Sequence, residues 1–215
     1  MFKTYGLIGE RLGHSMSPFI HEKFFSKTGF SGKYNLFEVK RDNLKDVVKA
    51  LKVLGIKGAN VTLPYKLDIM QYLDELSPEA EKIGAVNTIT ISENKAIGSN
   101  TDYHGFGMTL ENRGIDFRGK VAVILGTGGS SRAVLQYLID NGIGELVFVS
   151  RDCQKAKDNY KDFRIISYQE LRGTYGDILI NCTPVGMHPI VNACPVDDDI
   201  IGQFKVAVDI IYNPK

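Results

Sequence analysis

One segment of the chain limits the possible folds more than any other. Residues 120–142 read KVAVILGTGGSSRAVLQYLIDNG. An apolar run of strand length leads into a glycine-rich turn, and a helical pattern follows that stops at Asn141 and Gly142. A strand, a tight turn and a helix in this order open a βαβ unit, which predicts a parallel sheet in this part of the chain.

The glycine turn itself has two interpretations. Backbone amides at such a turn can approach a pyrophosphate at the helix N-terminus, where the helix dipole favours an anion. Gly126 and Gly128 fit the dinucleotide-binding pattern, whereas Ser131 stands where a third glycine is usual. The alternative is a tight turn without a ligand. The strand before it and the helix after it favour nucleotide binding.

The end of the next strand, VFVSRD, bears on which nucleotide would bind. An arginine here can pair with the extra phosphate of NADP, whereas NAD sites usually place an acid that accepts from the ribose hydroxyl. The chain has Ser150 and Arg151 at this point, with Lys155 close behind. Asp152 argues against NADP because a carboxylate repels phosphate, and Arg151 could be a solvated surface residue. On balance the sequence favours NADP.

Apolar runs and helical patterns alternate along the whole chain, which predicts an α/β fold with mainly parallel strands. The polar segment 112–120 separates a helix from the most apolar strand, so that helix would join two lobes. We place the domains at 1–102 and 103–215. Strands are predicted at 3–8, 34–39, 58–62, 88–91, 121–125, 146–149, 178–181 and 206–210, and helices at 18–27, 42–54, 65–73, 102–112, 130–140 and 154–160.

Composition excludes several classes of protein. The 26 basic and 25 acidic residues leave a net charge of +1, without a charged block that would bind nucleic acid. No apolar run reaches the roughly 20 residues that span a bilayer, and the first residues lack a cleavable signal, so we expect a cytoplasmic protein that does not bind membranes. The three cysteines, Cys153, Cys182 and Cys194, are expected to be reduced thiols. The histidines are scattered along the chain, which predicts no metal site; they are His14, His21, His104 and His188.

Two serines stand close together in HSMSP, residues 14–18. Serine is a good N-cap and proline suits the first position of a helix, so the start of a helix is enough to explain Ser17. Ser15 has no such local role. Two hydroxyls two residues apart in an extended loop face the same side, as a pair that binds a carboxylate or a ring hydroxyl would.

A second polar motif, NVTLPYK, ends at Lys66. The predicted helix over 65–73 would put Lys66 in its first turn, where the helix dipole disfavours a cation. A lysine whose charged form is destabilised is a candidate acid or base, although a solvated lysine remains the alternative. Further polar residues follow at Asn87 in GAVNT and at Asp102 in SNTD. Asp102 alone could be a helix N-cap.

The motifs HSMSP, NVTLPYK, GAVNT, SNTDYHGF, GTGGSSRA, CTPVGM and DIIYNP, in this order, resemble the shikimate dehydrogenase family over the whole chain. The resemblance implies an N-terminal α/β substrate-binding domain and a Rossmann-like dinucleotide-binding domain. It also implies a monomer or homodimer that reversibly reduces 3-dehydroshikimate to shikimate with NADPH, on the pathway to aromatic amino acids.

The same resemblance assigns roles to residues. Lys66 and Asp102 would be the catalytic pair. Substrate would be bound by Ser15, Ser17, Thr62, Lys66, Asn87, Asp102 and Tyr212. NADP would be bound by Gly126, Thr127, Gly128, Gly129, Ser130, Ser150, Arg151, Thr183 and Ile210.

Three departures from the family pattern leave alternatives open. Arg11 stands where the family often has proline, and Asp152 replaces a residue that is more often uncharged. Family chains usually continue through helices that pack back on the substrate lobe, whereas this sequence ends at Lys215. One alternative is therefore a catalytically impaired nucleotide-binding fragment. Another is a quinate/shikimate dehydrogenase that uses NAD, although Ser17, often threonine in quinate-preferring relatives, favours shikimate.

Overall fold

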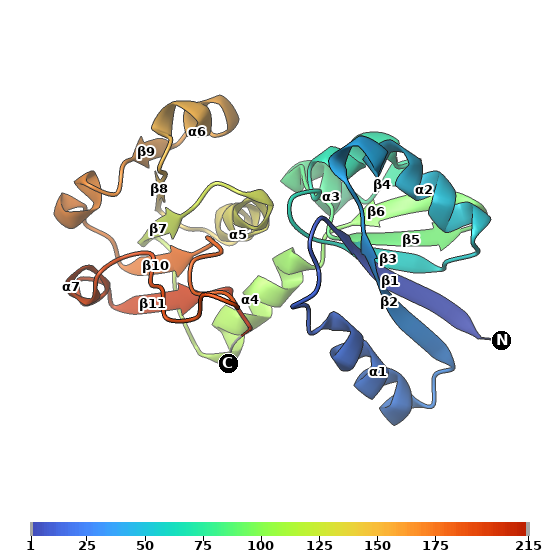
Figure 1. Cartoon of the computed structure of the whole chain (residues 1–215). Helices are drawn as coiled ribbons and strands as arrows, with labels where there is room; N and C mark the ends of the chain where they lie inside the picture. Colours follow the sequence, from blue (N-terminus) through green and yellow to red (C-terminus); the bar gives the residue numbers. More distant parts are fainter. Residues whose placement is uncertain (1, 214–215) are drawn as a thin grey trace. The chain divides into compact units, whose positions relative to one another are not determined.

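The computed structural model describes residues 2–213 and divides the chain into two compact units, Met1–Thr101 and Asp102–Lys215. Within each unit, helices cover both faces of one sheet (Figure 1). In the described part of the chain, no helix combines the length and the apolar character needed to cross a membrane.

The first unit holds a mixed six-stranded sheet in the order β2-β1-β3-β5-β6-β4. Strands β1, β2 and β3 are parallel to one another, β5 is antiparallel to β3 and β6, and β4 is parallel to β6. The strands are β1 (Lys3–Gly9), β2 (Gly32–Glu38), β3 (Gly58–Val61), β4 (Glu75–Leu76), β5 (Thr88–Ser92) and β6 (Lys95–Ser99). The helices are α1 (Ser17–Thr28), α2 (Leu44–Val53), α3 (Pro78–Ile83) and the 3-10 helices η1 (Arg41–Asn43) and η2 (Asp68–Tyr72).

Alternating side chains of β1 build the two apolar layers of this unit. Leu7 packs with Phe25 of α1 on one face, whereas Ile8 packs with Leu51 of α2 on the other. Adjacent residues of a strand point to opposite faces, so a strand buried on both sides is apolar throughout. As a result α1 covers one face of the sheet, and α2, α3 and η2 cover the other (Figure 1).

The second unit holds a five-stranded sheet in the order β11-β10-β7-β8-β9, and all its pairs are parallel. The predicted α/β class is confirmed, with a Rossmann-like parallel sheet here and a mixed sheet in the first unit. The strands are β7 (Val121–Leu125), β8 (Glu145–Val149), β9 (Arg164–Ile166), β10 (Ile178–Asn181) and β11 (Val206–Asp209). The helices are α4 (Asp102–Asn112), α5 (Gly129–Asp140), α6 (Cys153–Asn159), α7 (Asp198–Ile201) and the 3-10 helix η3 (Glu170–Gly173).

The prediction of a helix over 65–73 is wrong. Residues 63–67 form turns, and only the short 3-10 helix η2 follows. Tyr65 and Ile69 are fully buried, and the Tyr65 hydroxyl donates to the carbonyl of Val39 over 2.6 Å. Anchoring of Tyr65 in the core fixes this segment, so Lys66 lies in a turn and the argument from a helix dipole does not apply to it.

A close contact through Gly107 joins α4 to α5. A Cβ atom at Gly107 would lie 2.2 Å from the Tyr137 ring, a distance that side chains do not adopt. The Tyr137 hydroxyl donates to Glu111 over 3.0 Å, and burial, together with this carboxylate, raises the pKa of Tyr137. A helix is less stable with glycine than with alanine, but at position 107 only glycine leaves room for the Tyr137 ring.

We expect Gly107→Ala to destabilise the protein by about 1–3 kcal/mol, because the ring of Tyr137 has to move out of a packed core. Gly105 is the matched control, since it lies in the same helix and has open space at its Cβ position. Gly105→Ala should stabilise the protein by about 0.5–1 kcal/mol through helix propensity. Thermal unfolding of the two variants would measure this difference, and a shift of both midpoints in the same direction would contradict it.

Candidate active site

Each substrate-binding residue predicted in the first unit lies near the end of a strand. These strand ends share one edge of the sheet. The parallel strands β1 and β3 lead at their carboxyl ends into the serine loop, residues 10–16, and into Thr62. Strand β5 is antiparallel to β3, so its amino end, Thr88, pairs with Asn60 at that same edge. The carboxyl end of β6 pairs there with Thr88 through Ser99. Four distant parts of the sequence thus supply polar residues to one edge.

The two serines have local roles opposite to those that the sequence suggested. The Ser15 hydroxyl accepts a hydrogen bond from the Ser17 backbone N–H over 3.2 Å. Met16, not Ser17, is the N-cap residue of α1, and its own side chain makes no capping hydrogen bond. The N–H groups of the first turn of a helix have no acceptor within the helix, and Ser15 provides one for the N–H of Ser17. Both side chains are half-buried.

Backbone hydrogen bonds hold the Thr62 and Lys66 segment to the sheet and to the segment before β5. The Thr62 N–H donates to the carbonyl of Ile8 over 2.9 Å, which continues the pairing of β1 with β3. The carbonyl of Lys66 accepts from the Val86 N–H over 2.7 Å. Lys66 is half-buried and lies one residue after the anchored Tyr65.

Asn87 is buried, and its carboxamide fixes the segment that follows β6. Its Oδ1 accepts from the Thr101 N–H over 2.9 Å, and its Nδ2 donates to the Thr101 hydroxyl over 3.0 Å. Its carbonyl accepts from the Val61 N–H over 2.8 Å, next to Thr62. Asn100 is also buried and donates to the carbonyl of Ala85 over 2.9 Å.

Asp102 is the first residue of α4 and of the second unit. Its side chain is half-buried. Helix α4 packs on α5 through Gly107 and Tyr137, and the Tyr103 ring stands 5.2 Å from the Tyr137 ring in an edge arrangement. These contacts fix the helix that carries Asp102 to the body of the second unit.

The glycine turn has the backbone that the sequence predicts. Gly126 has a φ of 96°, and a Cβ there would lie 2.9 Å from the Thr183 side chain. Gly128 is the N-cap of α5, and a Cβ at Gly128 would meet nothing within 4 Å. The turn over Gly126, Thr127, Gly128, Gly129 and Ser130 therefore combines a left-handed residue at the strand end with an open approach to the twelve-residue helix α5.

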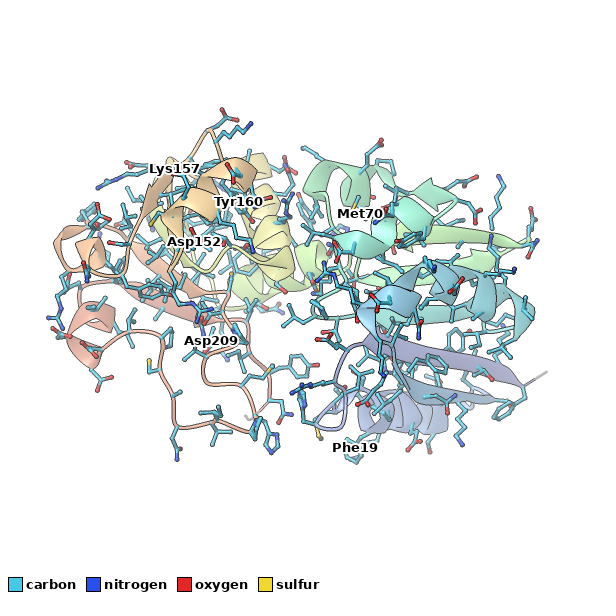
Figure 2. The ribbon with its side chains drawn as sticks, turned by 45° about the horizontal axis from the view of Figure 1, so that its top comes forward. Phe19, Met70, Asp152, Lys157, Tyr160 and Asp209 are labelled. Carbon is cyan, nitrogen blue, oxygen red and sulfur yellow. The ribbon has the colours of Figure 1, made fainter. Side chains whose placement is uncertain are left out.

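Ser131 explains how the chain manages without the third glycine. It is fully buried, and its hydroxyl donates to the carbonyl of Gly128 over 2.7 Å. It also bonds to the hydroxyl of Tyr160 over 3.0 Å, where burial raises the pKa of Tyr160. Tyr160 lies at the end of α6 (Figure 2). A serine is therefore tolerated at this buried position because its hydroxyl has two hydrogen-bond partners.

Asp152 has a structural role that the sequence analysis missed. It is the N-cap of α6, and its Oδ1 accepts from the Lys155 N–H over 3.0 Å (Figure 2). The buried Ser150 hydroxyl bonds to the backbone of Asp152, and Arg151 is exposed. An acid in this position is therefore explained by the helix start, a signal that N-cap preferences could have supplied.

Asn181, which the sequence did not single out, forms hydrogen bonds that hold the remaining predicted residues of the second unit in place. Its Oδ1 accepts from the Thr183 N–H and hydroxyl over 2.9 and 2.7 Å, and its Nδ2 donates to Asp209 over 3.2 Å. Asp209 ends β11 and accepts from the Ile211 N–H (Figure 2). Asn181 thereby fixes Thr183 and the start of the segment that carries Ile210, which is half-buried, and Tyr212, which is exposed.

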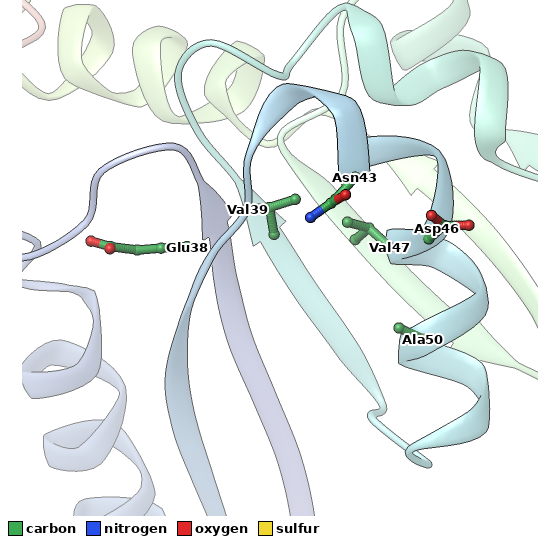
Figure 3. Close-up of a pocket in the computed structure, with 6 residues that line it drawn as sticks. All are labelled: Glu38, Val39, Asn43, Asp46, Val47 and Ala50. Atoms are coloured by element: carbon green, nitrogen blue, oxygen red, sulfur yellow. The ribbon is translucent and has the colours of Figure 1, made fainter.

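A pocket of the first unit lies beside α2 and contains none of the predicted site residues (Figure 3). Glu38, one of its lining residues, points away from the others toward the serine loop. Its Oε1 accepts from the Leu12 N–H over 2.7 Å. Glu38 therefore helps to hold the loop that carries Ser15. The lining residues are Glu38, Val39, Asn43, Asp46, Val47 and Ala50.

Comparison with known proteins agrees with the resemblance. Residues 7–89 match the shikimate dehydrogenase substrate binding domain. The chain is 52% identical over 213 residues to a shikimate dehydrogenase (NADP(+)) of Clostridium beijerinckii, which covers 98% of this chain and 78% of that protein.

Two solved structures are also similar to this chain. A chorismate mutase/shikimate 5-dehydrogenase fusion protein from Clostridium acetobutylicum superposes with a TM-score of 0.93 at 47% identity, covering 100% of this chain and 79% of that one. Shikimate 5-dehydrogenase from Thermus thermophilus in complex with NADP(H) and shikimate gives 0.86 at 31% identity, covering 99% and 80%. High identity over almost all of its length places this chain in the shikimate dehydrogenase family.

Proposed function

We propose that this chain is an NADP-dependent shikimate dehydrogenase that reversibly reduces 3-dehydroshikimate to shikimate, as a cytoplasmic monomer or homodimer. The observation that carries the proposal is the 52% identity to a shikimate dehydrogenase (NADP(+)) over nearly the whole chain. The gathering of four polar segments at one sheet edge supports it, because a polyhydroxylated carboxylate needs hydroxyl, amide and ammonium groups at one place.

On the substrate side, we assign the carboxylate to Ser15, Ser17 and Tyr212, and the ring hydroxyls to Thr62, Lys66, Asn87 and Asp102. The Ser15 oxygen accepts from the Ser17 N–H, which leaves the hydroxyl proton of Ser15 for a carboxylate. The amide of Asn87 is already oriented by Thr101. A group held in this way loses little side-chain entropy when it binds a ligand.

On the cofactor side, the residues of the second unit fit NADP. Gly128 leaves open space before the N-terminus of α5, where a pyrophosphate would approach backbone amides. Arg151 is exposed at the end of β8, where its guanidinium could pair with the 2′-phosphate. The remaining contacts are assigned to Gly126, Thr127, Gly129, Ser130, Ser150, Thr183 and Ile210. When bound, NADPH supplies the hydride.

The proton chemistry falls to the chain itself. Reduction of a ketone develops negative charge on its oxygen, and an ammonium beside that oxygen stabilises the charge and donates the proton. We assign this role to Lys66. The Asp102 carboxylate would orient the ammonium by accepting a hydrogen bond from it. In the reverse direction Lys66, as the free amine, takes the proton from the substrate hydroxyl.

The proposal is tested by offering the protein shikimate or quinate, each with NADP or NAD, and following nicotinamide reduction by absorbance. We expect the largest kcat/KM with shikimate and NADP. Preference for quinate with NAD would favour the quinate/shikimate dehydrogenase alternative. Absence of turnover with every pair would favour the impaired nucleotide-binding fragment.

Arg151→Ala makes the coenzyme assignment specific. Loss of a charge-assisted bond to the 2′-phosphate should lower kcat/KM for NADP about tenfold or more and leave that for NAD nearly unchanged. Lys161→Ala removes another exposed cation of the same unit and serves as the control. An equal loss with both coenzymes would contradict the role of Arg151.

A further inference from the structure

We propose that Tyr34 is a positioning residue for substrate binding, because its ring and its hydroxyl connect Ser17 to Asn87. The inference rests on the proposed function, which gives Ser15, Ser17 and Asn87 to the substrate. Tyr34 lies in the middle of β2 and is almost completely buried. All the residues of the connection belong to the first unit.

The connection to Ser17, the first residue of α1, runs through His21 of the same helix. The Nδ1–H of His21 donates to the carbonyl of Ser17 over 2.8 Å. The imidazole ring stacks on the Tyr34 ring, with 3.8 Å between centroids and 15° between planes. Tyr34 belongs to the same apolar cluster as Leu7, Leu12 and Phe25, which fixes the position of its ring. The stack therefore ties the first turn of α1, where Ser17 lies, to a rigid strand.

The connection to Asn87 runs through the Tyr34 hydroxyl. It donates to Oδ1 of Asn60 over 2.7 Å, and this bond sets which way the Asn60 carboxamide faces. Nδ2 of Asn60 then donates to the Thr88 hydroxyl over 3.2 Å. The Thr88 hydroxyl donates in turn to Oδ1 of Asn87 over 2.9 Å. Each donor in this series is paired with an acceptor. The hydrogen bond that the Tyr34 hydroxyl donates therefore determines which group donates and which accepts at every later step.

Asn87 is held at the far end of the series by Thr101, with one bond to its Oδ1 and one from its Nδ2. Its amide can donate to a ring hydroxyl in a fixed direction only while Oδ1 keeps its donors. These hydrogen bonds are partly buried, so they reinforce one another, and loss of one donor leaves an acceptor without its partner where water reaches it only in part. Removal of the Tyr34 hydroxyl should therefore loosen Asn60, Thr88 and Asn87 together.

Tyr34→Phe tests the inference, because it deletes the hydroxyl and keeps the stacked ring. Isothermal titration calorimetry should give a dissociation constant for shikimate about three- to tenfold larger than that of the wild type, as expected for one weakened hydrogen bond. The dissociation constant for NADP should not change. In steady-state kinetics the KM for shikimate should rise by a similar factor while kcat stays within about twofold, the signature of lost ground-state binding.

A second variant tests the other half of the connection. His21→Phe keeps an aromatic ring against Tyr34 but loses the Nδ1–H that holds the carbonyl of Ser17. It should also weaken shikimate binding without changing NADP binding. Tyr5→Phe is the matched control, since Tyr5 packs in the same cluster and its hydroxyl has no hydrogen-bond partner among the described residues.

The outcomes separate this inference from the proposed function. A wild-type protein that binds shikimate, together with a Tyr34→Phe variant of equal affinity, would overturn the positioning role alone. Weakening of shikimate binding by Tyr5→Phe to the same extent would also overturn it, since the effect would then be a general one of the cluster. A wild-type protein that binds NADP but no shikimate would overturn the substrate assignment and the positioning role together.

Discussion

Lys66→Ala is expected to lower kcat for shikimate oxidation by about 10²- to 10⁴-fold, the usual contribution of a positioned acid or base. The dissociation constant for shikimate should remain measurable, because the serines and Asn87 stay in place. Lys66→Arg keeps the positive charge, but a guanidinium does not exchange its proton near neutral pH, so this variant should recover little activity.

Stopped-flow and steady-state absorbance measurements, combined with calorimetric binding of shikimate, would separate turnover from affinity. Lys45→Ala is the control, because Lys45 is an exposed cation of α2 in the same unit. A kcat near that of the wild type in Lys66→Ala would remove Lys66 from the mechanism. Full activity in Lys66→Arg would show that charge alone is needed and that Lys66 transfers no proton.

Gly126→Ala is expected to weaken NADP binding by about tenfold or more and also to destabilise the protein. The substitution places a Cβ on a backbone with a φ of 96°, a conformation that costs about 1–2 kcal/mol for a residue other than glycine. That Cβ would also lie 2.9 Å from the Thr183 side chain and 3.3 Å from the backbone of Cys182. The turn and the Thr183 segment cannot both stay in place.

Gly128→Ala provides the contrast. Its φ of −85° suits alanine, and its Cβ would meet nothing in the free protein. Stability should therefore be unchanged, whereas NADP binding should weaken because a methyl group obstructs the approach of the pyrophosphate. Titration of NADPH by fluorescence and thermal unfolding of both variants distinguish the two effects. Unchanged NADPH affinity in Gly128→Ala would mean that the pyrophosphate does not approach this glycine.

Long, strongly periodic elements could be predicted from the sequence. The strand over 121–125 agrees with β7, and the helix over 130–140 differs from α5 by one residue. The unpredicted elements are short. Strand β6 was missed because its turn with β5 uses Glu93 and Asn94, both at positive φ, in place of the usual asparagine and glycine. Helix α3 has only six residues.

The candidate site was only partly predictable, for a related reason. Motifs at strand ends pointed to Ser15, Lys66 and Asn87, because the carboxyl ends of β1 and β3 and the amino end of β5 lie at one edge of the sheet. The residues that orient these groups lie elsewhere in the sequence. Tyr34 and Asn60 are 26 positions apart, and only the register of β2, β1 and β3 brings them together. A local pattern cannot specify such a pair.

The mixed sheet of the first unit has a thermodynamic consequence for its ligand. The groups assigned to shikimate in this unit are spread over positions 15 to 87, and β1, β3, β5 and β6 must all be paired before they meet. A compound that binds only the completed arrangement slows amide hydrogen exchange wherever the opening that allows exchange also separates these strands. Deuterium uptake along the whole of β3 and β5, the two central strands, would therefore report occupancy beyond the residues that contact the ligand.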